Sequence, residues 1–377
     1  MQTSKISLKN KKDFDFLRQI LAPYTKRVYL VGGSVRDLLL GKKLSDFDIE
    51  IYDLKFEVFD NLMQNLGANG VGKSFFVYKY KNFDISLARY ENKISVGHKG
   101  FKTFICNDEK QAALRRDFSI NSMMINIFND EFLDFYGGFE DLKDKILRHI
   151  NSDRFKEDSL RVLRAIHFVS RFELKLDQST LSLMKSMDIK DLSLDRINAE
   201  LYKFFEAKNL FLGFLLLQEL NLEEKIFYFN STAHKNYSLF KSLLKNSRKF
   251  VFDDGLFLYI YLNLFDINQK DFFKKTKIKK YFLKKSLQFF YKDEISYEKL
   301  CELALSMKLK QWLGLWNEKR INMAKELSCY DKKLDFKINS YELMKEGFYG
   351  KDLAYKIKEI QREKIKQKCA NLTKIMI

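Results

Sequence analysis

The hydrophobic periodicity of the chain changes near residue 153, and this change constrains the fold more than any other feature. Before it, short apolar or alternating runs such as VYLVGG (28–33), FDIEIY (47–52) and FDISLA (83–88) are separated by Gly, Asn and Asp, a pattern typical of β-strands. After it, apolar residues recur at three- and four-residue spacing, as in LRVLRAIHFVSRF (160–172), which indicates helices. The sequence therefore predicts an α+β fold in which a mixed α/β head precedes an all-helical remainder.

The same features divide the 377 residues into three predicted parts. A head occupies 1–150, a helical neck 151–235, and a helical body and tail 236–377. Ten of the 15 glycines lie in the head, where sharp turns between short strands require them. A chain of this length is sufficient for two or three domains with cores of their own.

The charge balance predicts a polyanionic partner. A formal net charge of +18 and a pI near 9.4 favour either nucleic acid or an anionic membrane surface. A membrane is not expected, because the apolar stretch 210–217 is interrupted by Gly213 and is too short to span a bilayer, and the first 14 residues lack an apolar signal core. The four cysteines are far apart in sequence and form no CxxC pair, so we expect a reducing, cytoplasmic location.

A glycine pair marks a predicted anion site. Residues 28–37 read VYLVGGSVRD, a strand that breaks at Gly32 and Gly33 and enters a helix. Glycine lets the backbone approach a ligand closely, and the free N–H groups of a new helix attract phosphate. Arg36 follows one helical turn later. Most strand–helix turns with two glycines bind nothing, so this prediction depends on what comes next.

Two carboxylates follow the glycine pair within about a dozen residues. In SDFDIEIY, Asp46 and Asp48 are two positions apart on a predicted strand, so both side chains face the same side. Like charges held together require a cation, and hard oxygen ligands suit Mg²⁺. Mg²⁺ at this position would bridge a nucleoside triphosphate and lower the barrier to attack by a hydroxyl. A solvated acidic pair on an edge strand is the alternative, and the phosphate turn just upstream argues against it.

The glycine pair and the two carboxylates together resemble the motifs of a known family. GGSVRD followed by DFDIEIY is similar to the polymerase-β-like nucleotidyltransferases, and specifically to the class II tRNA CCA-adding enzymes and their bacterial poly(A) polymerase relatives. Further segments resemble the motifs of that family in the family's own order. These are its RRD motif (113–126), its flexible GG-x-x-DL segment (135–150), its EDxxR nucleotide-selecting helix (155–168), the helix that closes the neck (195–205) and a tail segment (338–360).

The resemblance implies a function and a set of site residues. It implies template-independent addition of CCA to the 3′ end of tRNA from CTP and ATP, with Mg²⁺ held by Asp46 and Asp48 and with release of pyrophosphate. The RRD motif contains two arginines, and one arginine of such a pair often only forms an ion pair. The resemblance assigns the contact with nucleotide to Arg116. The residues expected to bind nucleotide are Gly32, Gly33, Arg36, Arg116, Asp158, Arg161 and Arg164.

Hydrogen bonding explains how the EDxxR helix would select bases. Glu157, Arg161 and Arg164 fall on one helical stripe with Asp158 beside it, a pattern that alone usually means a surface ion-pair ladder. Cytosine and adenine both present an amino donor beside a ring-nitrogen acceptor. Asp158 would accept from the first and Arg161 would donate to the second. Uracil and guanine have the opposite polarity and would leave both protein groups unpaired in a buried site.

Two residues and one segment depart from the expected pattern. His167 occupies a position where relatives often carry another arginine, so we interpret it as a packed histidine. Asp84, in FDISLAR, is interpreted as a structural strand residue rather than a third metal ligand. The segment GKSFFVYKY (72–80) lacks the paired basic residues before Phe that are associated with bacterial poly(A) polymerases. That favours CCA addition.

The predicted body contains a lysine-rich segment. Between Asp271 and Leu300 there are nine lysines against four acids, interleaved with aromatic residues. A helix of this composition would bury its aromatic rings and present lysines to RNA phosphates. A solvated lysine face is the alternative for any one of these residues.

Other functions remain open at this level. Within the family these are poly(A) polymerase and an enzyme that adds only CC or only A. Outside it, the intact D-x-D argues against an inactive RNA-binding protein, and the basic helical body argues against nucleotide transfer to a protein or small molecule.

Overall fold

The computed structural model describes residues 8, 11–72, 76–93 and 101–375. The chain forms two compact units, Met1–Glu200 and Leu201–Ile377, and each is described by itself. The boundary between them falls within helix α9 (Leu194–Phe205). The first unit therefore contains the predicted head and the first part of the predicted neck, and the three-part division stays a prediction.

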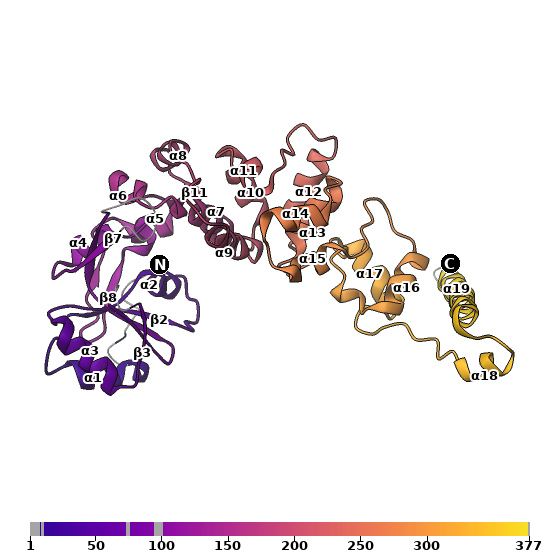
Figure 1. Cartoon of the computed structure of the whole chain (residues 1–377), viewed down its shortest axis with the longest axis horizontal. Helices are drawn as coiled ribbons and strands as arrows, with labels where there is room; N and C mark the ends of the chain where they lie inside the picture. Colours follow the sequence, from indigo (N-terminus) through magenta and orange to yellow (C-terminus); the bar gives the residue numbers. More distant parts are fainter. Residues whose placement is uncertain (1–7, 9–10, 73–75, 94–100, 376–377) are drawn as a thin grey trace. The chain divides into compact units, whose positions relative to one another are not determined.

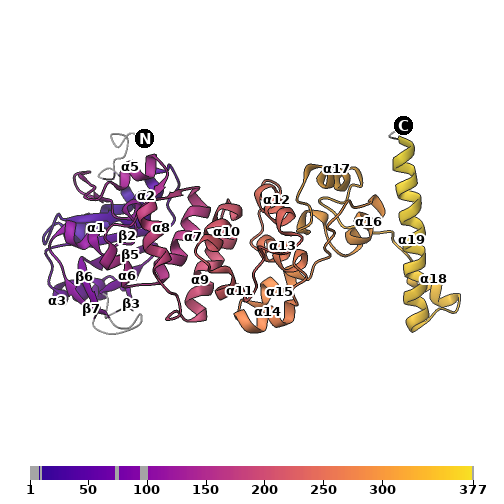
Figure 2. The same cartoon turned by 90° about the horizontal axis from the view of Figure 1, so that it is seen from above.

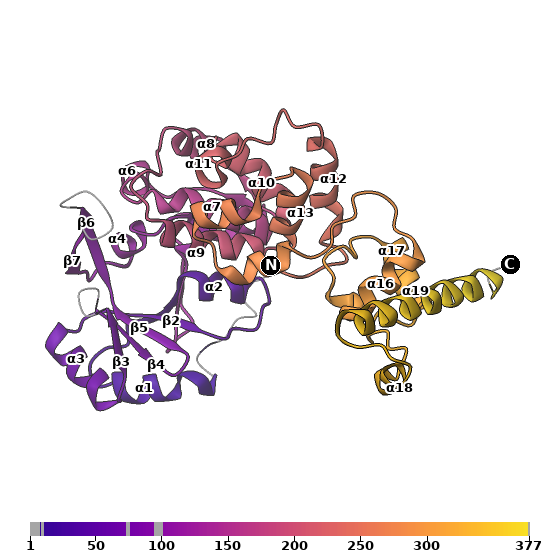
Figure 3. The ribbon, with the colours of Figure 1, turned by 45° about the vertical axis from the view of Figure 1, so that its right-hand side comes forward.

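A seven-stranded mixed sheet forms the centre of the first unit (Figures 1 and 3). Its strand order is β3-β4-β5-β2-β1-β8-β9, and all neighbours are antiparallel except β2 and β5, which run parallel. The strands expected at 28–33, 47–52 and 83–88 are confirmed as β1, β2 and β5. The bounds are β1 Val28–Val31, β2 Phe47–Ile51, β3 Asn69–Gly72, β4 Val77–Tyr80, β5 Phe83–Leu87, β8 Met124–Asn126 and β9 Phe132–Leu133.

Helices and two small sheets complete this unit. One sheet pairs β6 (Arg89–Lys93) with β7 (Phe101–Ile105), and the other pairs β10 (Ile146–Leu147) with β11 (Lys175–Leu176). The helices are α1 Asp15–Leu21, α2 Gly32–Leu39, α3 Phe56–Asn65, α4 Glu109–Leu114, α5 Gly138–Lys143, α6 Ser152–Lys156, α7 Leu160–Phe172, α8 Gln178–Lys185 and the start of α9, with short 3-10 turns η2 at Lys12–Phe14 and η4 at Ser119–Asn121.

The second glycine of the GG-x-x-DL segment is closely packed. A Cβ added to Gly138 would lie 2.1 Å from the carbonyl oxygen of Ser119, so no larger residue fits where α5 begins against η4. Asp134 accepts hydrogen bonds from the N–H groups of Gly138 and Phe139 at 2.8 and 2.9 Å. The resemblance implied a flexible segment here, which stays a prediction; in the structure α5 packs against η4.

The second unit is helical in its described residues. One apolar core brings together three cysteines that are far apart in sequence, Cys301, Cys329 and Cys369, all of them free thiols. The long helix α19 packs against α16 in this core, with α18 beside its first turns (Figure 2). The helices are α10 Leu210–Glu219, α11 Glu223–Phe227, α12 Tyr237–Ser247, α13 Leu256–Leu264, α14 Gln269–Thr276, α15 Lys280–Ser286, α16 Tyr297–Ser306, α17 Glu318–Glu326, α18 Ser340–Lys345 and α19 Gly350–Ile375, with η5 at Leu309–Gln311.

We expect a helix in the lysine-rich segment from its sequence. The structure shows separate helices there, among them α14 and α15, rather than one continuous helix. The segment is broken between α14 and α15 because Lys277 adopts a left-handed backbone, with φ of 57°, and its N–H caps the end of α14 at the carbonyl of Phe273. The expected division of side chains holds in part: Phe272, Phe273 and Phe282 are buried. Tyr281 is exposed. In the part of the chain that the structure describes, no helix is both long and apolar enough to cross a bilayer.

Candidate active site

The predicted phosphate turn lies between β1 and α2. Gly32 opens α2 with φ of +66°, a conformation that glycine adopts without strain. A Cβ added here would be 2.6 Å from Nη1 of Arg116 and 3.7 Å from Oδ2 of Asp48. A guanidinium and a carboxylate thus lie so close to the turn that they leave no room for a side chain at residue 32. A phosphate held beside a cation would be expected to have these two groups around it.

Asp48 faces this turn from β2. Ser34 of α2 connects the two elements, because its hydroxyl accepts a hydrogen bond from the Asp48 N–H at 3.0 Å and lies 3.4 Å from Asp48 Oδ2. Asp46 precedes the strand rather than lying within it, and Ser45 donates to its carboxylate at 2.9 Å. Ser34 was missed by sequence reasoning, although its place directly after the glycine pair was a usable signal.

Asp84 is the parallel-strand neighbour of Asp48. The register of β2 and β5 pairs these two residues directly, which places both carboxylates on one face of the sheet. This position favours a third acidic group at the site over the structural role expected from the sequence. Asp84 also forms an ion pair with Lys79 at 3.5 Å, with both side chains partly exposed.

The charge state of Asp48 fits a cation site. Burial raises the pKa of Asp48 above its ordinary value; Arg116 opposes this shift and the Asp84 carboxylate adds to it. A cation among these carboxylates would offset both burial and repulsion. Within the described residues, no three His, Cys, Asp or Glu side chains are gathered into a ready-made metal site.

Glu50 lies two residues after Asp48 on β2 and was not singled out from the sequence. It is fully buried and forms ion pairs with Arg115 at 2.5 Å and Arg116 at 3.2 Å. Burial alone would raise the pKa of Glu50, but the two guanidiniums outweigh it and hold the pKa below its ordinary value. Tyr52 donates a further hydrogen bond to the carboxylate at 2.7 Å.

Asp117, the third residue of the RRD motif, joins the head to α7. Its Oδ2 accepts a hydrogen bond from Nε of Arg164 at 2.6 Å, and its Oδ1 accepts one from Asn121 at 2.9 Å. Burial disfavours the charge, but Arg164 and the Asn121 hydrogen bond keep the pKa of Asp117 well below its ordinary value. Arg164 is thus paired with protein, and its position favours orienting α7 over a direct contact with nucleotide.

Arg36 occupies a different position from the one expected. Its side chain is buried, and it donates to Asn121 at 2.5 Å and to Asp37 at 2.9 Å. Its guanidinium lies 4.5 Å from the ring centroid of Phe172. A cation enclosed in this way is not available to a triphosphate, so the structure favours a structural role for Arg36. Arg116 is the arginine that lies over the turn.

The two predicted base readers lie at the start of α7. The helix begins at Leu160, so Glu157 and Asp158 belong to the turn before it, and the single helical stripe predicted from the sequence is wrong at these two positions. Oδ1 of Asp158 accepts hydrogen bonds from Arg196 at 3.0 Å and from the Leu160 N–H at 3.2 Å. Among the described residues, no hydrogen bond to Oδ2 of Asp158 is found. This second carboxylate oxygen is therefore available to a ligand.

Arg161 is anchored through backbone carbonyls. Its Nη1 donates to the carbonyl of Arg154 at 2.9 Å and its Nη2 to the carbonyl of Arg115 at 2.7 Å. A guanidinium has five N–H donors in a rigid fork, so donors remain for a base. Burial lowers the pKa of Arg161, with Asp117 and Asp158 opposing the shift.

His167 packs inside the first unit, as expected. It lies on α7, and its Nδ1 is 2.7 Å from Oε2 of Glu200 on α9, with both side chains buried. This pair joins the two helices that lie side by side in Figure 1. His167 therefore does not take over the phosphate or base contact that an arginine at this position would make.

Comparison with known proteins shows which family the chain resembles. Residues 28–148, which carry the phosphate turn, the acidic strand and RRD, match the family model described as the poly(A) polymerase head domain. The curated relatives include CCA-adding and A-adding tRNA nucleotidyltransferases. The chain is therefore similar to the class II CCA-adding nucleotidyltransferases, most directly in its head region.

Two curated relatives illustrate the extent of the match. The A-adding tRNA nucleotidyltransferase of Aquifex aeolicus is 28% identical over 89% of this chain and 44% of its own length. The CCA-adding enzyme of Buchnera aphidicola is 34% identical over 53% of this chain and 49% of its own length. The chain thus spans about half the length of the curated relatives it matches.

Solved structures of family members share the fold. The Thermotoga maritima CCA-adding enzyme complexed with tRNA superposes with a TM-score of 0.68 at 20% identity, covering 98% of this chain and 97% of that one. The Bacillus stearothermophilus CCA-adding enzyme in complex with CTP gives a TM-score of 0.67 at 19% identity, covering 95% and 94% of the two chains. At these identities the likeness shows the fold alone.

Proposed function

We propose that the protein adds CCA to the 3′ end of tRNA from CTP and ATP, without a template and with release of pyrophosphate. The observation that carries this proposal is the base-reading pair. Asp158 keeps one carboxylate oxygen for a ligand, and Arg161 is fixed by two backbone carbonyls. Together they offer one acceptor and one donor, the complement of the edge that cytosine and adenine share.

Each part of the candidate site has a role in this proposal. The N–H groups at Gly32 and Gly33 and the guanidinium of Arg116 hold the triphosphate. Asp46 and Asp48, with Asp84 beside them, would hold Mg²⁺, which would supply charge neutralisation of the triphosphate and activation of the attacking hydroxyl. Arg36 and Arg164 stay in the proposal as residues that shape the site.

The chemistry is an in-line displacement at the α-phosphate. The 3′-hydroxyl of the RNA forms the new bond to phosphorus, and pyrophosphate leaves with the electrons of the broken bond. The protein contributes position and charge rather than a covalent intermediate. We place the reaction in the cytoplasm, in agreement with the free thiols of all four cysteines.

Addition of A alone is a second candidate. The Aquifex relative that matches 89% of this chain is an A-adding enzyme, whereas the Buchnera CCA-adding enzyme matches 53% of it. The two functions share the site described above, since both need an amino-bearing base.

The acceptor end distinguishes these functions. Purified protein is given tRNAs that lack the last three, two or one nucleotide of CCA, together with CTP and ATP. We expect each tRNA to be completed to CCA and then to stop. Extension of only the tRNA that lacks the final A would establish A addition. Long A tails made with ATP alone would establish a poly(A) polymerase, and no extension of any tRNA would refute the proposal.

Lysines of the second unit are the proposed contacts to the tRNA backbone. Lys279, Lys280 and Lys284 are exposed, and no carboxylate partner is recorded for them among the described residues. Beside them, a cavity of about 530 Å³ is lined by five lysines around an apolar floor that includes Phe273 and Ile278. Lysines around an open surface neutralise phosphate and release counterions on binding.

Replacing Lys279, Lys280 and Lys284 together by glutamine should weaken tRNA binding and flatten its salt dependence. The slope of log affinity against log salt should fall by roughly one for each lost phosphate contact, or about three in all. The control is a second triple glutamine variant, at three lysines that each form an ion pair with a carboxylate. An unchanged slope in the test triple would exclude this surface as the RNA contact. The control residues are Lys299, Lys310 and Lys319, paired with Glu302, Asp331 and Glu294.

A further inference from the structure

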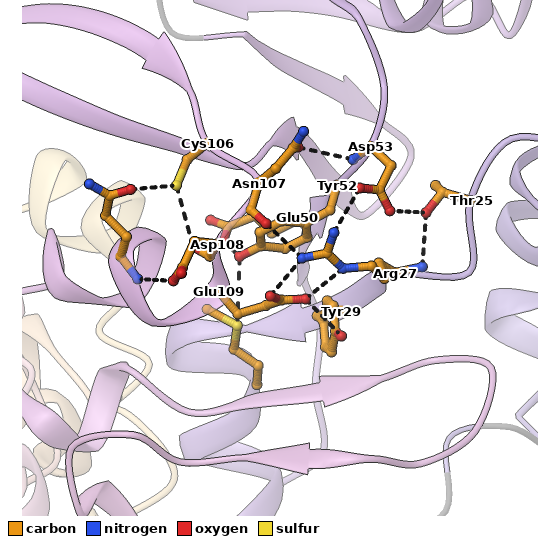
Figure 4. Close-up of polar contacts among 12 residues, drawn as sticks. Thr25, Arg27, Tyr29, Glu50, Tyr52, Asp53, Cys106, Asn107, Asp108 and Glu109 are labelled. Atoms are coloured by element: carbon orange, nitrogen blue, oxygen red, sulfur yellow. Dashed lines mark hydrogen bonds and ion pairs between the residues drawn. The ribbon is translucent and has the colours of Figure 1, made fainter.

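Glu50 is a buried carboxylate at the junction of the two halves of the candidate site. It follows Asp48 by two residues on β2, so its side chain leaves the same face of the strand. Its side chain is 0% exposed, and Tyr52 donates to its Oε1 at 2.7 Å (Figure 4). Its Oε2 accepts hydrogen bonds from Arg115 at 2.5 Å and from Arg116 at 3.2 Å.

The first arginine on Glu50 belongs to the phosphate turn. Nη1 of Arg116 lies 2.6 Å from where a Cβ on Gly32 would be, while its Nη2 is bound to Glu50. The carboxylate thus holds one end of the guanidinium and leaves the other end over the turn. An arginine on a surface would have several rotamers, and fixing it in advance removes that entropy loss from ligand binding.

The second arginine on Glu50 belongs to the base reader. The side chain of Arg115 is held by Glu50 and by the carbonyl of Arg89, to which its Nε donates at 3.1 Å. The carbonyl of Arg115 in turn accepts the hydrogen bond from Arg161 at 2.7 Å. Arg161 therefore binds the backbone of the same residue whose side chain Glu50 holds.

We propose that Glu50 is a positioning residue that sets both nucleotide affinity and base selectivity without touching the nucleotide. It fixes Arg116 over the triphosphate turn and, through Arg115, fixes Arg161 at the base. This inference rests on the proposed function, whose site it deepens. A charged acceptor is required, because a neutral group would bind the two guanidiniums more weakly and let both relax.

The test is direct binding of CTP, ATP and UTP to the full chain without RNA. Glu50→Gln keeps the shape of the side chain and removes its charge. We expect its Kd for CTP and ATP to rise on the order of tenfold and its preference for CTP over UTP to shrink. The control is Glu109→Gln. It removes the charge of another carboxylate in the same unit, which forms an ion pair with Arg27 at 2.7 Å and accepts a hydrogen bond from the Tyr29 hydroxyl at 3.0 Å (Figure 4), and it should leave nucleotide binding unchanged.

Coupling separates a positioning role from a purely structural one. If Glu50 acts through Arg116, Glu50→Gln should add little to the loss of CTP affinity already caused by Arg116→Ala, because the two changes remove one interaction. Fully additive losses would overturn the proposal. A folded Glu50→Gln protein with a lowered Tm but the Kd values and base preference of the wild type would also overturn it, since the carboxylate would then serve only stability.

Two further variants keep the test decisive. Glu50→Asp retains the charge on a side chain one methylene shorter, and its Kd should lie between those of the wild type and Glu50→Gln. Should Glu50→Gln not fold, Arg116→Ala alone decides: nucleotide affinity equal to the wild type would refute the proposed chain of contacts. Since binding is measured without RNA, a wild type that binds nucleotide but extends no tRNA would refute the proposed function and leave the role of Glu50 testable.

Discussion

Replacing Asp48 by alanine should abolish nucleotide addition while leaving tRNA binding nearly intact. Asp48 is the acidic residue closest to the phosphate turn, connected to it by Ser34 and neighboured by Asp84. Without it the site loses a proposed metal ligand, and we expect the rate to fall by roughly a thousandfold or more. Asp46→Ala should have an effect in the same direction. The measurement is single-turnover extension of tRNA at saturating Mg²⁺ and CTP.

A control for Asp48 is available two residues after the end of the same strand. Asp53→Asn also removes an acidic charge, but Asp53 pairs with Arg27 at 2.7 Å away from the phosphate turn (Figure 4), so its activity should stay close to that of the wild type. Near-normal turnover of Asp48→Ala with Mg²⁺ would rule out the metal assignment. Equal loss in both variants would indicate a general effect of charge on folding instead.

Removing the base-reading pair should relax the choice of nucleotide. Asp158→Ala leaves the amino group of cytosine or adenine without its acceptor and removes the penalty against an oxygen at that position. Incorporation of CTP and ATP should drop, and discrimination against UTP and GTP should fall by roughly ten- to a hundredfold, the value of one such contact. Arg161→Ala should act in the same direction, and the double mutant should be less than additive because both groups read one edge.

The measurement is kcat/KM for all four nucleotides on a tRNA that lacks its final A. Asp153→Ala is the matched control, since Asp153 is an exposed carboxylate on the short helix before the base-reading turn and should change neither rate nor selectivity. An equal loss for every nucleotide in Asp158→Ala, with selectivity preserved, would mean that this segment only positions the substrate and that base selection lies elsewhere.

Local patterns in the sequence were sufficient for the parts of the site that lie on single elements. The alternation in FDIEIY placed Asp48 on one face of a strand, and the glycine pair placed the phosphate turn where β1 enters α2. The apolar spacing over 160–172 predicted the helix that the structure shows as α7. These features follow from backbone geometry and nearest neighbours along the chain, which a sequence encodes directly.

The partners of these side chains were decided only by the tertiary structure. The alternation of the strand predicts that Asp48 and Glu50 share one face. It does not predict that parallel pairing of β2 with β5 places Asp84 beside Asp48. Nor does it predict that arginines some 65 residues later in the sequence bind Glu50. Strand order and register depend on burial summed over the whole sheet, which no local window contains.

The same reason explains the two departures inside the predicted site. Arg36 looked available because it is one turn from the glycines, yet Asn121 and Phe172 enclose it from distant segments. The helix expected through Glu157 and Asp158 is interrupted there, and Arg196 of α9 binds Asp158 in the turn. Residue type and spacing thus indicated which chemistry to expect of this chain, and packing between distant segments decided which charged groups are paired with other parts of the protein.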